Sequence, residues 1–165
     1  MNLPAPLIDE IIISTFVDSD HAHDKVTRRS ITGIISMLGR TPVFYQSKRQ
    51  GAVATSTYSA EFAALRTAVE ETIALRYMLR CLGVKVETPS YLMGDNLGVI
   101  QNATIKESLL KKKHVAVSYH MVREATAARI ALPVKIKSKD NYSDLLMKSL
   151  AFADFSRLTG GIFCG

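Results

Sequence analysis

Four acidic residues stand at positions where they could take part in chemistry together. Asp18 ends an apolar, β-branched run, IIISTFVD, and Asp95 ends the short run SYLMGD in the same way. Glu61 lies on the apolar side of a stretch rich in Ala, Glu and Leu, and Asp144 stands in the first turn of the last segment with helical character. Clustered carboxylates raise one another's pKa values, a cost that bound cations relieve. Four acids meeting at one point would therefore form a cation site.

Each acid also has an ordinary structural interpretation. Asp18 and Asp95 could start turns, Asp144 could favour a helix dipole, and Glu61 could be solvated. The four together, at compatible ends of elements, favour a shared site. Hard oxygen ligands without a cysteine pair indicate magnesium or manganese and not zinc. Two such ions about 3.5–4 Å apart would suit in-line displacement at phosphorus.

The elements that would position these acids follow from the pattern of apolar residues. Strands are predicted at 11–18, 31–39, 43–49, 90–95 and 132–137. Helices are predicted at 57–82, with Thr57 as N-cap and Gly83 just past the end, at 96–103, within 106–130, and at 141–155. Three strands joined by short connections, followed by αβ units, predict an α/β fold. Its mixed sheet would have five strands, three antiparallel and then two parallel, flanked by helices.

Length and composition limit the alternatives. The chain has 165 residues, 47% of them hydrophobic, which suits one globular domain. We expect an extended lead-in at 1–10, the domain at 11–155 and a tail at 156–165. No apolar run approaches the length of a membrane span, and no signal peptide is evident. We therefore expect an intracellular protein, monomeric by default. The formal charge of +6 favours a polyanionic partner.

Seven blocks of sequence occur in one order with close spacing, and together they carry a family resemblance. They are FVDSD, TRRSITG, QSKRQ, TYSAEFAAL, MGDNLGVIQ, KKKHVAVSYHMVREA and NYSDLLMKSL. This succession resembles the ribonuclease H domain at the end of copia-type retrotransposon polyproteins. The resemblance covers about residues 15–150.

The resemblance implies the ribonuclease H-like fold and cleavage of the RNA strand of RNA–DNA hybrids by two divalent metal ions. Carried over residue by residue, its four carboxylates are Asp18, Glu61, Asp95 and Asp144. The implied cofactors are two Mg²⁺ ions, with Mn²⁺ as a possible substitute. A reverse transcriptase domain of the same polyprotein would be a possible partner, and the cytoplasm, a virus-like particle or the nucleus a possible place.

Basic and amide side chains are the candidates for binding the hybrid. Pairs of cations would contact phosphates with little sequence preference, and KKKH gathers cations that repel unless an anion approaches. Small or amide side chains beside the acids are candidates for sensing 2′-hydroxyls. The predicted substrate-binding residues are Arg28, Arg29, Lys48, Arg49, Gln50, Thr57, Asn96, Lys112, Lys113 and His114.

The chain departs from the family pattern without losing a carboxylate. An aromatic residue and a glycine of the family are replaced by His21 and His23, a threonine by Lys112 and a proline by Ser149, and there is no Trp. The mobile histidine of cellular type 1 enzymes has no counterpart in SKDNYSD. Either that role is unfilled, or Lys139 or another group takes it.

DSDHAHD at 18–24 also has the composition of a local transition-metal site. Two histidines separated by one residue face the same side only in an extended segment, and this segment is predicted to be a loop. A solvated loop is therefore the favoured interpretation. In the alternative, His21 or His23 contacts the substrate or moves a proton.

Three functions compete. The first is a metal-dependent nuclease for RNA–DNA hybrids. The alternative is an inactive ribonuclease H-like module that binds nucleic acid or a polymerase partner, although retention of all four acids disfavours it. A related nuclease acting on DNA is the third, because the fold serves several phosphoryl-transfer enzymes.

Overall fold

The computed structural model describes residues 11–21, 26–105 and 116–163 of the chain. Its strands are β1 (Ile13–Asp20), β2 (Ile31–Leu38), β3 (Thr41–Arg49), β4 (Ser90–Gly94) and β5 (Ala131–Lys135). Its helices are α1 (Thr57–Cys81), α2 (Leu97–Thr104), α3 (Ala116–Ala127) and α4 (Phe152–Phe163), with two short 3₁₀ helices, η2 (Ser138–Asp140) and η3 (Tyr142–Leu146).

The five strands form one mixed sheet in the order β3-β2-β1-β4-β5. β1 pairs with β2, and β2 with β3, in the antiparallel sense, whereas β1–β4 and β4–β5 are parallel. The predicted arrangement of three antiparallel and then two parallel strands is therefore confirmed. Because β1 and β4 are parallel neighbours, their carboxyl ends, where Asp18 and Asp95 lie, meet at one end of the sheet.

α1 owes its length to its composition and its two caps. Its apolar residues recur at helical spacing, and the side chains of Phe62, Leu65 and Val69 are buried as predicted. The N-cap is Ser56 and not Thr57, because the Ser56 side chain accepts a hydrogen bond from the backbone N–H of Ser59. At the other end Gly83 adopts a left-handed conformation, with φ of 78°, and ends the helix.

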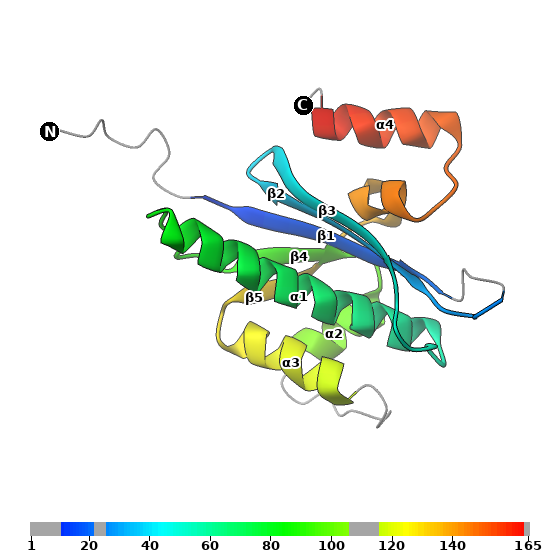
Figure 1. The fold of residues 1–165 in the computed structure, drawn as a ribbon, viewed down its shortest axis with the longest axis horizontal. Helices are drawn as coiled ribbons and strands as arrows, with labels where there is room; N and C mark the ends of the chain where they lie inside the picture. The colour runs from blue at the N-terminus through cyan, green and yellow to red at the C-terminus, as the bar shows by residue number, and fades with distance from the viewer. Residues whose placement is uncertain (1–10, 22–25, 106–115, 164–165) are drawn as a thin grey trace, which may run out of the picture.

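Both faces of the sheet are covered (Figure 1). α1, α2 and α3 lie on one face, where Val17 and Ile34 pack against Phe62 and Val122. η3 and α4 lie on the other, where Phe16 and Ile35 pack with Ile162. Strand residues alternate between the faces, so Asp18, next to Val17, belongs to the side of β1 that η3 covers.

The single helix predicted over 141–155 is wrong. The chain forms η3, then leaves helical structure, and α4 begins only at Phe152. Tertiary bonds override local helix propensity here, because the buried Asn141 side chain donates to the backbone oxygen of Val17 and fixes a tight turn on the sheet. Asp144 accordingly lies in a 3₁₀ helix and not in the first turn of the last α-helix.

The remaining boundaries are partly outside the described residues. The lead-in at 1–10 and the segment 106–115, which includes LLKKKH, are not described. The predicted boundary between domain and tail at residue 155 falls inside α4, and two later residues of that helix, Leu158 and Ile162, are buried. Among the described residues, no helix has both the length and the apolar character needed to cross a membrane.

Candidate metal centre and nucleic-acid interface

Three of the predicted acids converge from three elements. Asp18 lies near the end of β1, Glu61 in the second turn of α1, and Asp95 between β4 and α2. One carboxylate oxygen from each lies within 4.8 Å of the others, a separation that a shared cation could bridge. The Asp18 side chain is almost fully buried, and the other two are half-buried.

The fourth acid, Asp144, is linked to Asp18 by ion pairs with one lysine. Lys148 Nζ lies 2.6 Å from Asp18 Oδ2 and 2.8 Å from Asp144 Oδ1, so one ammonium joins β1 to η3. Both oxygens are buried, and neither accepts a hydrogen bond of good geometry from another group among the described residues. All four predicted acids are therefore gathered at one end of β1.

Burial and mutual repulsion disturb the ionisation of this cluster. Burial, followed by the negative charge of Asp18, a hydrogen bond to it and the charge of Asp95, raises the pKa of Glu61 to about 9. Burial also raises the pKa of Asp144 to about 6, against the lowering effect of Lys148. Burial lowers the pKa of Lys148, but the hydrogen bonds and charges of Asp144 and Asp18 outweigh it and raise the pKa above its usual value.

Two residues without charge allow η3 to lie against Asp18. Asn141, fully buried, donates to the oxygen of Val17, while its own Oδ1 accepts from Ser143. Gly33 pairs with Asp18 across β1 and β2. A Cβ at Gly33 would lie 2.8 Å from the backbone oxygen of Ser143, so a side chain there would displace η3.

The donor set fits a hard divalent cation. The ligating atoms are carboxylate oxygens, which Mg²⁺ and Mn²⁺ prefer, and the buried oxygens Asp18 Oδ2 and Asp144 Oδ1 already attract one positive group, the Lys148 ammonium. Residues Asp18, Glu61 and Asp95 would hold one cation. No group of three ligands that includes Asp20 or His21 comes together within the described part of the chain.

The predicted binding residues that the structure describes lie at the ends of several elements. Arg28 and Arg29 are exposed just before β2, and Lys48 and Arg49 are exposed at the end of β3. Thr57 is exposed at the first position of α1. Lys112, Lys113 and His114 lie outside the described residues, as does His23. Lys139 is exposed in η2, and no contact of its side chain tests the role considered for it.

Gln50 and Asn96 have structural contacts as well. Gln50 Nε2 donates to Thr32 Oγ1 at 3.0 Å and to the backbone oxygen of Ala60 at 2.9 Å, which ties the end of β3 to α1 beside Glu61. Asn96 Oδ1 accepts from the backbone N–H of Val99 and caps α2. The amide group of Gln50 is thus occupied, whereas that of Asn96 donates to no group within the described ranges of the chain.

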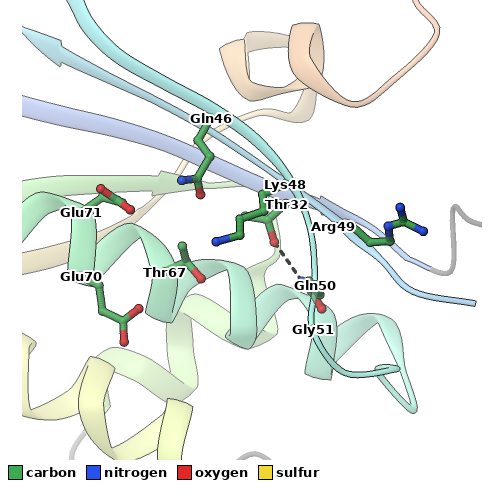
Figure 2. Close-up of a pocket in the computed structure, with 9 residues that line it drawn as sticks. All are labelled: Thr32, Gln46, Lys48, Arg49, Gln50, Gly51, Thr67, Glu70 and Glu71. Carbon is green, nitrogen blue, oxygen red and sulfur yellow. Dashed lines mark hydrogen bonds between the residues drawn. The ribbon is translucent and has the colours of Figure 1, made fainter.

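Lys48, Arg49 and Gln50 share an open pocket of about 250 Å³ between β3 and α1 (Figure 2). Lys48 reaches into the pocket and Arg49 points away from it. The facing wall on α1 carries Glu70 and Glu71, so the pocket has charges of both signs. The pocket is therefore not a simple anion site.

Curated relatives match nearly the whole chain. It is 29% identical over 153 residues to the retrovirus-related Pol polyprotein from transposon RE2 of Arabidopsis thaliana, which covers 91% of the chain and 10% of the polyprotein. It is 30% identical over 137 residues to the Pol polyprotein from transposon TNT 1-94 of Nicotiana tabacum, covering 83% and 10%. The chain thus spans about a tenth of the length of these relatives. No family model matches it.

Solved structures agree with the topology. The N-terminal ribonuclease H domain of Rv2228c from Mycobacterium tuberculosis superposes with a TM-score of 0.64 at 12% identity, over 89% of this chain and 98% of that one. Ribonuclease H1 of LC11, isolated from compost and solved with an RNA/DNA hybrid, gives 0.59 at 14% identity, over 78% and 88%. The chain has the ribonuclease H-like fold. Its resemblance to a region of copia-type retrotransposon Pol polyproteins is likewise confirmed.

Sequence reasoning missed two features of this ribonuclease H-like domain. Lys148 stands four residues after Asp144, a spacing that brings side chains together on a helical turn and was the available signal. Gly33 lies in a strand interior, where a glycine can mark the close approach of another backbone.

Proposed function

We propose that this chain is a metal-dependent endoribonuclease that cleaves the RNA strand of RNA–DNA hybrids, as part of a reverse-transcribing polyprotein. The observation that carries the proposal is the convergence of Asp18, Glu61 and Asp95 within 4.8 Å in a ribonuclease H-like fold. Structural neighbours solved with an RNA/DNA hybrid, LC11 ribonuclease H1 among them, support the choice of substrate.

The four acids would hold two divalent cations, Mg²⁺ or in its place Mn²⁺. When bound, such cations would activate the attacking water and stabilise the leaving 3′ oxygen. The protein's own part is positioning: Asp18 is fixed in the sheet, Glu61 on a long helix and Asp144 on a segment tied to β1. Glu61, whose pKa of about 9 keeps it protonated at neutral pH, would give up its proton as it becomes a ligand.

The hybrid would lie across this end of the sheet. Arg28, Arg29, Lys48 and Arg49 would contact phosphates, and Lys112, Lys113 and His114 would extend that surface. The amide group of Asn96, the hydroxyl of Thr57 and the amide oxygen of Gln50 would contact 2′-hydroxyls across the minor groove.

The decisive experiment compares substrates and metals. The purified domain is incubated with a labelled hybrid, duplex DNA and duplex RNA, each with Mg²⁺, with Mn²⁺ and with chelator. We expect loss of the RNA strand of the hybrid alone, and only with a divalent cation. Asp95→Asn should lower the rate by more than about 100-fold, because even residues that merely support a metal ligand cost 10–100-fold.

Glu87→Gln is the matched control, since it removes one exposed carboxylate far from the cluster. It should leave the rate unchanged. Full activity of Asp95→Asn would refute the site, and cleavage of duplex DNA would refute the substrate. Binding of the hybrid without cleavage under every metal condition would establish the inactive module instead.

A further inference from the structure

The ammonium of Lys148 stands at a place where cations are expected. It contacts the two buried oxygens, Asp18 Oδ2 and Asp144 Oδ1, at 2.6 Å and 2.8 Å. Asp18 is also one of the three acids whose oxygens could share a cation with Glu61 and Asp95. Asp18 therefore belongs to two places that could hold a cation. It shares the first with Glu61 and Asp95, and the second with Asp144.

A divalent cation and this ammonium cannot occupy the second position together. Mg²⁺ binds carboxylate oxygens at about 2.0–2.1 Å, so an ion joining Asp18 Oδ2 to Asp144 Oδ1 would overlap Lys148 Nζ. We propose that Lys148 is a positioning residue that serves as a built-in counter-ion for the Asp18–Asp144 pair and competes with the second divalent cation. This inference rests on the proposed function, because it concerns the same acids.

The charges explain why a lysine would be kept there. Two buried carboxylates without a cation repel each other and lose hydration, and one ammonium offsets both costs. It also holds η3 against β1, so the ligands of the second cation are already near their final places. A divalent cation carries twice the charge of the ammonium and can offset the repulsion between the two carboxylates in its place.

The side chain of Lys148 has room to leave. It lies after the last residue of η3 and is 36% exposed, whereas the two acids that it joins are buried. Rotation of its stem would carry the ammonium into solvent without moving the backbone. Exchange of lysine for metal would therefore need no unfolding of η3.

The test measures cation binding and stability, with no substrate present. Mg²⁺ and Mn²⁺ are titrated by calorimetry into the wild-type domain, Lys148→Met, Lys148→Arg and Lys85→Met. Lys85 is exposed near the end of α1, so its removal lowers the net charge equally without touching the acids. The thermal midpoint of each protein is recorded in chelator and in Mg²⁺.

Lys148→Met should bind the weaker of two cations about tenfold more tightly, because the competing charge is gone. It should also lose thermal stability in chelator and regain it in Mg²⁺. Lys148→Arg, which keeps the charge, should bind as weakly as wild type, as should Lys85→Met. If Lys148→Met does not fold in chelator, Mg²⁺ should fold it.

Two outcomes would overturn the inference. Equal affinities in Lys148→Met and Lys85→Met would show that the lysine does not compete, and weaker binding in Lys148→Met would show that it supports the metal. Failure of the wild-type domain and of Lys148→Met to bind any divalent cation at millimolar concentration would refute the proposed function itself. The failures of the two proposals are thus distinguishable.

Discussion

The ionisation of Glu61 links the chemistry of the site to the stability of the domain. Without a cation, Glu61 is a half-buried acid among other acids, and its pKa of about 9 compares with an ordinary value of 4.5. Between these two pH values the folded chain holds a proton that the unfolded chain has released. Asp144, with a pKa of about 6 against 3.8, adds to the same effect over a narrower range.

The metal-free domain should therefore lose stability as the pH rises. This contribution is fully present below pH 4.5 and is lost towards pH 9, because stability falls with pH wherever the folded state binds more protons. From pH 5.5 to 8.5 we expect a loss on the order of 2 kcal/mol in the free energy of unfolding, given 1.36 kcal/mol per pKa unit and sharing of protons within the cluster. Urea unfolding in chelator at each pH measures it.

Glu61→Gln isolates the contribution of this residue. Its amide cannot ionise, so most of the pH dependence between 6 and 9 should vanish. Addition of Mg²⁺ to the wild-type domain should reverse the dependence, because a cation favours the ionised form. Equal slopes for wild type and Glu61→Gln in chelator would contradict the assignment.

The residue types and their positions in the sequence predict which acids come together, but they do not predict the contacts that surround these acids. Asp18, Glu61 and Asp95 could be found because each lies within or directly after an element with a clear apolar pattern. The ion pair between Lys148 and Asp18 could not, since it depends on how η3 packs against β1, although the spacing of four residues was a signal for the pair with Asp144. The burial of Asn141 was equally hidden, because an Asn in a polar stretch indicates only a turn.

Among the elements, η3 has the greatest effect on the site, and the sheet determines where it lies. Its hydrophobic residues Leu145 and Leu146 pack with Phe16 and Ile35, and Ser47 of β3 donates to the oxygen of Leu146 at 2.7 Å. η3 therefore crosses β1, β2 and β3, which places Asp144 beside Asp18. The absence of a side chain at Gly33 permits this close approach.

Gly33→Ala should therefore separate Asp144 from Asp18. The new Cβ would lie 2.6 Å from Met147 Cε and 2.8 Å from the backbone oxygen of Ser143, and backbone cannot yield as a side-chain end can. We expect a loss of about 1–3 kcal/mol in stability, typical of overpacking. Hybrid cleavage should fall further than stability alone explains, which cleavage assays well below the thermal midpoint would show.

Gly160→Ala is the matched control for this change. Gly160 lies in α4, and a Cβ there meets no atom of the described residues within 4 Å. Alanine in place of glycine inside a helix stabilises by about 0.5–1 kcal/mol. A normal rate in Gly33→Ala would show that η3 tolerates displacement and that Asp144 is not needed in its present place.

The elements that apolar periodicity specifies were predicted, and those that tertiary contacts specify were not. The five strands and α1 follow from patterns of period 2 and 3.6 within one segment. η3 has good helix formers around it, yet the bond from Asn141 to Val17, 124 residues away in sequence, keeps it short. No local pattern contains a contact of that range.

At the scale of the whole molecule, exposed cations at the end of β3 stand at the same end of the sheet as the acids. Asp18 pairs with Gly33, and Gly33 with Ser47, so Lys48 and Arg49 stand one and two residues beyond the row that contains Asp18. Strands lie about 4.8 Å apart, which puts the backbone of β3 roughly 10 Å from that of β1. Acids gathered at one point, with Lys48 and Arg49 exposed near them, suit a chain that binds a polyanion and holds divalent cations.

The contribution of Lys48 and Arg49 to hybrid binding can be measured through the salt dependence of the affinity. Hybrid affinity is determined in the Asp95→Asn background, so that no cleavage occurs, at several salt concentrations. Lys48→Gln/Arg49→Gln should bind more weakly and should reduce the slope of log affinity against log salt by nearly 2, since each lost phosphate contact removes about 0.9.

Arg80→Gln/Lys85→Gln is the control that separates local contacts from total charge. Both double variants lower the formal net charge of +6 by two. Arg80, however, lies in the last turn of α1, about 28 Å along the helix axis from Glu61, which is nearly three Debye lengths at 0.1 M salt. If the two variants change affinity and slope equally, only net charge attracts the hybrid. If only the Lys48–Arg49 variant changes them, the end of the sheet that holds the acids is also the surface that binds the phosphates.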